Sequence, residues 1–185
     1  MLLFSCQSSE ENNTKTAPVA ANQEQINSGL KHAMAVQKVL GGNLKAAMQA
    51  GGPMSAVEFC HLNALALTDS AASAQGVRIK RVSDQERNSK NAANADELAY
   101  ITAMKDAING GEAPSAAGTV LNGQFTGYYP ITTQELCLKC HGNPGTQVTP
   151  ELATHIASKY PEDKALGYGV GELRGIWVVE FPVEE

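Results

Sequence analysis

A C-x-x-C-H pattern constrains this chain more than any other feature of its sequence. The run reads Cys137-Leu138-Lys139-Cys140-His141. Two thiols at this spacing can add across the two vinyl groups of a porphyrin, and one helical turn then brings the following imidazole beneath the iron. The fold must therefore leave a cavity for a large flat group beside a short helix. The pattern predicts one covalent haem c, attached through Cys137 and Cys140, with His141 as an iron ligand.

Two other chemistries use cysteine and histidine at similar spacings. A zinc site would combine Cys137, Cys140 and His141 with a fourth ligand such as Cys60. A redox-active dithiol would stand at the start of a helix that follows a strand in a βαβ unit. The sequence around the motif shows no such unit. The pattern therefore favours haem, with the zinc site and the dithiol as alternatives.

The N-terminal residues indicate export, which agrees with haem attachment because that process takes place outside the cytoplasm. Residues 1–6 read M-L-L-F-S-C and partly match a bacterial lipobox, in which a small residue precedes the cysteine that receives lipid. Their apolar run is shorter than the roughly 7–15 residues of a signal-peptide core, and no basic residue precedes it. The alternative is an unstructured N-terminus with a stray cysteine. We expect lipid on Cys6 and a location in the periplasm or at the cell surface.

Composition separates a tether from a folded region and excludes some partners. Residues 7–23 are polar and lack an apolar period, so they are predicted to be a disordered tether. Residues 24–185 are predicted to form the haem domain. The net charge of −5 argues against nucleic acid, because no basic patch is available to neutralise phosphates. No run reaches about 18 apolar residues, so the only expected membrane attachment is lipid at Cys6.

Apolar periodicity and turn residues divide the folded region into helices and strands. Asn22 and Gln25 are spaced like a helix N-cap and its partner, and Gly51-Gly52-Pro53 ends that helix and starts another. We expect a kink at Gly41-Gly42. The remaining predicted elements are a helix at 54–73, a strand at 77–82, a helix at 96–109, one or two strands within 119–131, a short helix at 151–160 and a buried strand within 173–182. Two helices followed by mixed strands and helices predict an α+β domain with an antiparallel sheet.

Five stretches, in order along the chain, resemble the PAS-like c-type haem domain family. This family was once catalogued as a domain of unknown function and is often fused to sensor histidine kinases. The stretches are Gly52-Pro53 with Ala56-Val57 and Cys60; Ile79-Lys80-Arg81-Val82-Ser83 with Arg87-Asn88; Asn91 with Asp96-Glu97-Leu98; Cys137 to Gly142; and Tyr160 to Ala165 with Gly167-Tyr168, Gly171 and Arg174-Gly175. The resemblance implies a PAS-like antiparallel sheet with flanking helices and a long N-terminal helix. It also implies a haem held between His141 and the thiolate of Cys60.

Reasoning from the residues themselves also favours Cys60 as the second iron ligand. With Cys6 assigned to lipid and the motif cysteines to thioethers, Cys60 is a lone thiol in an oxidising compartment, where it is a liability unless buried or used. It shares an apolar helix face with Val57 and Ala64. Neighbouring His61 is the rival ligand, because it lies about 100° around the helix and only one of the two can face the iron. A buried structural thiol is the other alternative.

Basic residues are candidates for contacts with the haem propionates, because guanidinium groups pair well with carboxylates. The candidates are Lys80, Arg81, Arg87 and Arg174. We select Arg81 and Arg87, since the family resemblance covers both. The alternative for each is a solvated position on the surface.

Two functions from different classes fit these residues. The first is a redox or small-gas sensor module that passes its state to a signalling protein. The second is an electron-transfer cytochrome with a redox partner in the periplasm or at the cell surface. We do not expect an enzyme, because the sequence shows no acid–base constellation and two iron ligands would leave no open position for a substrate. A neighbouring gene for a kinase or cyclase would favour the sensor, and one for a terminal oxidase or multihaem cytochrome would favour the carrier.

Overall fold

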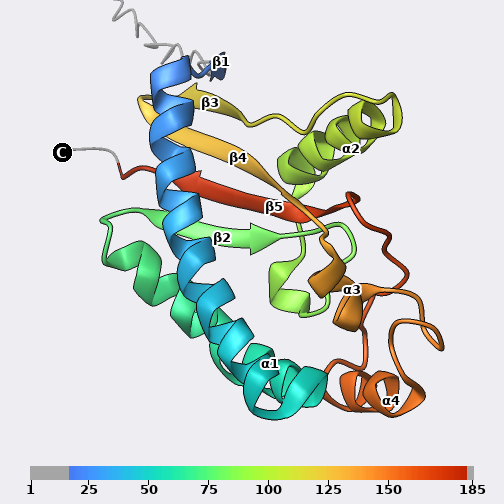
Figure 1. Cartoon of the computed structure of the whole chain (residues 1–185). Helices are drawn as coiled ribbons and strands as arrows, with labels where there is room; N and C mark the ends of the chain where they lie inside the picture. The colour runs from blue at the N-terminus through green and yellow to red at the C-terminus, as the bar shows by residue number, and fades with distance from the viewer. Residues whose placement is uncertain (1–16, 183–185) are drawn as a thin grey trace, which may run out of the picture.

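The computed structural model describes residues 17–182, which form a five-stranded sheet flanked by helices (Figure 1). In chain order the elements are β1 (Val19–Ala20), α1 (Gln23–Ser73), β2 (Arg78–Val82), the 3₁₀ turn η1 (Ser89–Asn91), α2 (Ala95–Asn109), β3 (Ala117–Leu121), β4 (Gln124–Thr132), α3 (Glu135–His141), α4 (Pro150–Lys159) and β5 (Leu173–Glu180). The strand order is β1-β3-β4-β5-β2, and every neighbouring pair is antiparallel. The predicted α+β class, antiparallel sheet and long N-terminal helix are confirmed.

The two faces of the sheet are covered by different helices. Along β5, Trp177 and Val179 belong to the apolar cluster under α1, whereas Ile176 and Val178 belong to the cluster under α2. All four are at most 3% exposed. Because successive strand residues point to opposite faces, a strand buried on both sides has a continuous apolar sequence. This burial makes β5 the centre of the fold.

Helix α1 has two arms joined by a sharp kink. Its start is the predicted capping box, in which the Asn22 side chain accepts from Gln25 N at 2.9 Å and the Gln25 side chain accepts from Asn22 N at 3.0 Å. The kink lies at Gly51 and Gly52, whose backbone angles are non-helical. The predicted kink at Gly41-Gly42 is wrong, since the helix is regular there. A glycine is tolerated within a helix, whereas a residue before proline is pushed out of the helical region.

Two further segments differ in detail from the sequence-based expectations. Val19 and Ala20, which we expected within the tether, form a strand whose register pairs Val19 with Val120 and Ala20 with Thr119. The predicted strands within 119–131 form a hairpin that turns at Asn122-Gly123, where both residues have positive φ. Positive φ at both central positions is typical of the two-residue hairpin turn that matches strand twist. Cys6 lies outside the described residues.

Within the described residues, no helix is both long enough and apolar enough to span a bilayer.

Candidate functional site

One cavity brings together residues from α1, the end of β2, the loop after it, α3 and β5. Its empty volume is about 1210 Å³ when the open mouth is included. Apolar side chains such as Ala56, Val57 and Ala64 make much of the wall. The polar and sulfur-containing lining residues include Cys60, Arg81, Glu86, Arg87, Cys137, Cys140, His141 and Arg174. All six residues predicted to bind the cofactor therefore line this cavity.

The C-x-x-C-H residues form the short helix α3 that the motif requires. Cys137 N donates to Gln134 O at 2.8 Å at the start of the helix, and Gly142 N donates to Leu138 O at 2.9 Å at its end. Cys137 and Cys140 are half-buried free thiols, so no disulfide joins them. A β-carbon at Gly142 would overlap the Gln147 side chain and lie 2.6 Å from the backbone oxygen of Leu138, so only glycine fits where the chain leaves the helix.

His141 is oriented by a backbone carbonyl. Its Nδ1 lies 2.8 Å from Ala165 O, and because a carbonyl can only accept, Nδ1 carries the proton. Nε2 therefore keeps its lone pair for a metal. Burial, together with the positive charges of Arg174 and Arg87, holds the pKa of His141 well below its usual range. The imidazole is thus neutral at pH 7, which is the form that binds iron.

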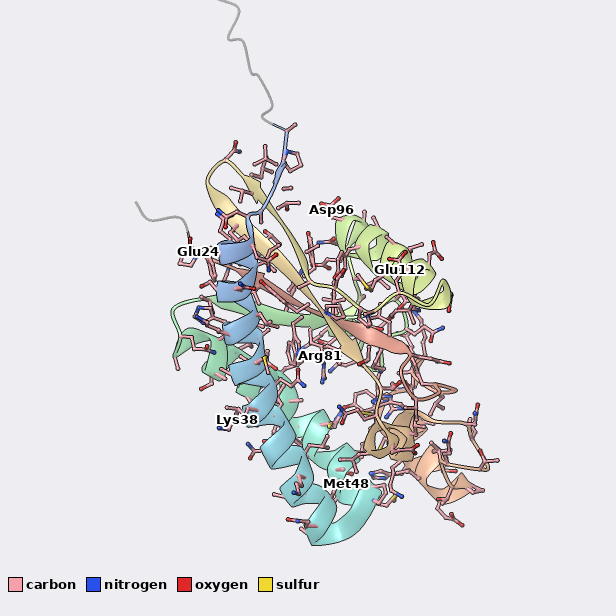
Figure 2. All side chains as sticks on the ribbon, turned by 45° about the horizontal axis from the view of Figure 1, so that its top comes forward. Glu24, Lys38, Met48, Arg81, Asp96 and Glu112 are labelled. Atoms are coloured by element: carbon pink, nitrogen blue, oxygen red, sulfur yellow. The ribbon has the colours of Figure 1, made fainter. Side chains whose placement is uncertain are left out.

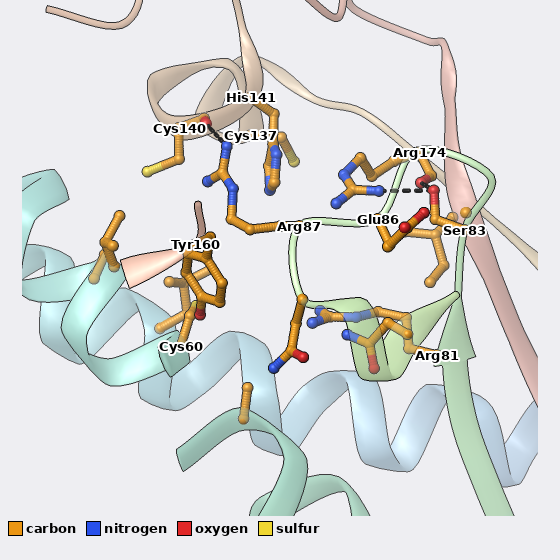
Figure 3. A pocket seen from close by; sticks show the side chains of 18 of the residues that line it. Cys60, Arg81, Ser83, Glu86, Arg87, Cys137, Cys140, His141, Tyr160 and Arg174 are labelled. Carbon is orange, nitrogen blue, oxygen red and sulfur yellow. Dashed lines mark hydrogen bonds between the residues drawn. The ribbon is translucent and has the colours of Figure 1, made fainter. Parts of the chain in front are cut away.

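Cys60 and His61 lie in different environments. Cys60 lines the cavity on the α1 side, across from His141 on the α3 side (Figure 3). Burial raises the pKa of the Cys60 thiol, and the charges of Arg81 and Arg87 act in the opposite direction. His61 is exposed and packs edge-to-face on Tyr160 at 5.2 Å between ring centroids. It is not among the cavity residues, so the helix presents the thiol and not the imidazole.

The basic candidates differ in how their charges are matched. Lys80 binds Glu97 at 2.6 Å and lies outside the cavity. Arg87 forms an ion pair with Asp163, with 3.0 Å between Nη2 and Oδ2, and also donates to Cys140 O at 2.7 Å. Arg87 is therefore already committed to protein groups, which the sequence did not reveal.

Arg81 and Arg174 carry the charge that protein carboxylates do not match. Arg81, near the end of β2, is exposed where it lines the open cavity, and its guanidinium lies 5.9 Å from the ring centroid of Trp177 (Figure 2). Arg174 stacks over Tyr168 and donates to Ser83 Oγ at 2.9 Å, while its buried Nε has no hydrogen-bond partner. Within residues 17–182, no carboxylate lies within 4 Å of either guanidinium. The cavity therefore offers unmatched positive charge to an anionic ligand.

The described part of the chain contains no group of three or more His, Cys, Asp or Glu side chains placed to hold a metal ion. The four-ligand zinc site considered as an alternative is thus not assembled in this structure.

Sequence reasoning missed two groups that shape the site. Asp163 lies within a stretch that carried the family resemblance, but nothing in the sequence linked it to Arg87, which is 76 residues away. The carbonyl of Ala165 is a backbone atom and leaves no signal in the sequence. Both groups reach the site because the segment after α4 passes beside His141.

Comparisons with known proteins agree with the resemblance seen in the sequence. A family model described as Tll0287-like matches residues 10–182. Among solved structures, the crystal structure of the cyanobacterial haem protein Tll0287 matches with a TM-score of 0.62 and 22% sequence identity. The match covers 89% of this chain and 99% of that one. At this identity the likeness concerns the fold. No curated protein matches the chain.

Proposed function

We propose that this chain, which belongs to the Tll0287-like family, holds one covalent haem c in the cavity between α1 and α3. The observation that carries the proposal is the convergence of Cys137, Cys140, His141 and Cys60 on one cavity from distant parts of the sequence. The related structure is that of a cyanobacterial haem protein, which supports the same ligand. When bound, the haem supplies an iron that takes up and releases one electron.

Different residues of the cavity would bind different parts of the haem. Cys137 and Cys140 form the two thioethers, and His141 presents Nε2 to the iron because Nδ1 is engaged by a carbonyl. Cys60, which lines the cavity across from His141, would hold the metal as a thiolate that the metal's charge would stabilise. The anionic propionates fit Arg81 and Arg174 better than Arg87, since Arg87 already has Asp163.

Covalent attachment is tested on the denatured protein. We expect the purified protein to keep its haem on a denaturing gel and to stain for peroxidase activity. The variant Cys137→Ala/Cys140→Ala should lose the stain, because both thioethers are gone. The single variant Cys6→Ala is a matched control, since it removes a cysteine far from the motif and should keep the stain. A colourless wild-type protein with one equivalent of zinc would refute the proposal.

The role of Cys60 is tested by spectroscopy. The ferric wild type should show the low-spin signature of a thiolate ligand in its absorption and electron paramagnetic resonance spectra. Cys60→Ala should lose that signature, while His61→Ala should retain it, because His61 is not a cavity residue. If Cys60→Ala leaves the spectrum unchanged, Cys60 is not the ligand.

We propose that the protein is a redox or small-gas sensor rather than an enzyme. Cys60 would hold the oxidised metal as a thiolate, and it would take up a proton from solvent when the haem is reduced and the attraction for the thiolate is weaker. Burial raises the pKa of this thiol, which supports its protonated form once the iron no longer binds it. The vacated position would then accept a small gas, and a partner protein would detect the change. Carbon monoxide binding to the reduced protein tests this, and an unchanged spectrum under carbon monoxide argues against a gas sensor.

An electron-transfer cytochrome is the second candidate, favoured by the cavity's opening at the protein surface. Leu136 lines the cavity and is 48% exposed, so a haem edge beside α3 would lie near solvent. Rapid oxidation by a soluble electron acceptor without loss of the Cys60 ligand would support this role over sensing.

The location is also a proposal. We infer a lipid anchor at Cys6 on a bacterial membrane, facing the periplasm or the cell surface, with no nucleic-acid partner. In a Gram-negative host, Cys6→Ala of the full precursor should move the protein from the membrane fraction to the soluble fraction. Retention of this variant in the membrane would contradict the anchor.

A further inference from the structure

The carbonyl oxygen of Ala165 accepts two hydrogen bonds from two functional side chains. His141 Nδ1 donates to it at 2.8 Å, and Arg87 Nη2 donates to it at 3.2 Å. A carbonyl has two lone pairs and can accept both bonds. The second donor is a cation, however, and it draws electron density from the same oxygen. The ring proton of His141 is therefore shared with a carbonyl that Arg87 polarises.

The position of this carbonyl does not depend on Arg87. Four other hydrogen bonds hold the segment, each using a backbone N–H: Ala165 N to Asp163 Oδ1 at 2.9 Å, Lys164 N to Glu86 O at 3.1 Å, Gly167 N to Gly142 O at 3.0 Å and Tyr168 N to His141 O at 2.9 Å. Removal of the guanidinium would therefore free a lone pair on the oxygen and leave the oxygen in place.

The charge of Arg87 is held beside the site by a buried partner. Asp163 accepts from Arg87 Nε at 3.1 Å, and the two side chains are 6% and 10% exposed. Water screens such a pair only weakly, and charge-assisted bonds of this kind are stronger than neutral ones. Arg87 is thus fixed in the geometry in which it competes for the Ala165 carbonyl.

We propose that Arg87, held by Asp163, is a positioning residue that limits how strongly the Ala165 carbonyl polarises His141. This inference rests on the proposed haem, because its consequence is felt at the iron. A weaker hydrogen bond to Nδ1 makes the imidazole a poorer donor, and a poorer donor favours the ferrous over the ferric state. Arg87 therefore raises the reduction potential, both through the carbonyl and through its positive charge.

Three variants of the haem-loaded protein separate the two contributions in a redox titration against mediators. Arg87→Met removes the bond and the charge, and should shift the one-electron equilibrium about tenfold toward the ferric form, which is about 59 mV lower. Asp163→Asn keeps an acceptor for Ala165 N but removes the negative charge that compensates the positive charge of Arg87. The reduction potential of this variant should therefore rise. Arg87→Met/Asp163→Asn removes both charges, and its potential should remain below that of the wild type because the carbonyl is released.

The matched control is Arg78→Met. Like Arg87, Arg78 pairs with one carboxylate, Glu180 at 2.9 Å, but it lies on β2, is exposed and is outside the cavity. It should leave the potential at the wild-type value. A purely structural role for Arg87 would lower stability without giving opposite shifts for Arg87→Met and Asp163→Asn. A double variant at the wild-type potential would overturn the proposal, because only the charges would then matter.

Two further measurements test the inference if Arg87→Met does not fold or if the wild type carries no haem. If Arg87→Met does not fold, Arg87→Lys decides: its ammonium cannot reach all the acceptors, so the potential should fall, and an unchanged value overturns the inference. If the wild type carries no haem, the proposed function fails, and the ¹⁵N shift of His141 Nδ1 in the haem-free protein decides instead. That shift should change in Arg87→Met and not in Arg78→Met, and equal shifts in all three proteins overturn the inference.

Discussion

Replacement of Gly29 by alanine should destabilise the protein, although alanine is the better helix former. Gly29 lies on the first arm of α1 where the helix crosses β4. A β-carbon there would overlap the hydroxyl oxygen of Tyr129 and would lie 2.9 Å from its Cζ and 3.1 Å from Phe125 Cε1. Tyr129 is 2% exposed and donates to Ile26 O at 2.9 Å. The ring cannot give way without losing that bond.

Gly29→Ala changes the free energy of unfolding through contributions of opposite sign. Overpacking of a dense core costs roughly 1–3 kcal/mol. Loss of the Tyr129 hydrogen bond costs about 1 kcal/mol more, because the buried hydroxyl would be left without its acceptor. Exchange of glycine for alanine inside a helix raises the free energy of unfolding by about 1 kcal/mol. The net expectation is a loss of ~2 kcal/mol in the free energy of unfolding, or about 4–8 °C in Tm for a chain of this size.

The assay is urea unfolding and thermal melting of the haem-loaded protein, followed by circular dichroism. Gly41→Ala is the matched control, because it lies on the same helix and its added β-carbon meets no atom within 4 Å. That variant should gain roughly 0.5–1 kcal/mol. If Gly29→Ala is stabilised as much as Gly41→Ala, the close approach between α1 and the sheet is not as described, and the reasoning fails.

Three further predictions concern the site. The free energy of unfolding of the haem-free protein should fall as pH falls below about 6.5, because burial lowers the pKa of His141 and the unfolded chain takes up the proton first. The free energy of unfolding of His141→Gln should depend less on pH. Gly142→Ala should reduce covalent haem attachment in the gel stain, since its β-carbon would collide with Gln147 and disturb the end of α3. Gly52→Ala should cost about 1–3 kcal/mol and alter the spectroscopic signature of Cys60, because φ +66° with ψ −159° is a conformation that only glycine adopts readily. An unchanged spectrum and unfolding midpoint for Gly52→Ala would contradict that account.

The sequence predicted those elements whose signals are local. Asn22 and Gln25 fix the start of α1 through a capping box, and the motif cysteines lie on the helix that their spacing requires. The run at β5 has no alternation because both of its faces are buried. In each of these cases one short window of sequence contains the whole physical cause.

The parts that were missed depend on distant partners or on backbone atoms. The strand at Val19–Ala20 exists because β3 offers an edge for pairing, which a polar flanking sequence does not reveal. Arg87 stays a predicted contact for a propionate, and what the sequence did not reveal is its ion pair with Asp163. The type of a residue indicates which interactions it can make, but the fold determines which partner lies within reach.

The kink in α1 links the fold to the proposed chemistry. A straight helix would carry Cys60 away from the sheet, because each residue adds about 1.5 Å along the axis. Gly51 and Gly52 instead turn the second arm back toward β2, and the start of this arm packs against α4 (Figure 1). On this arm, Val57 joins an apolar cluster with residues of α4, which fixes the arm in place. The thiol of Cys60 thus faces His141 across a cavity whose α1 and α3 sides are tied together by this cluster, because Cys140 also packs against it. Such a cavity can keep its shape when a bond to Cys60 forms or breaks, and a ligand-exchange sensor needs that property.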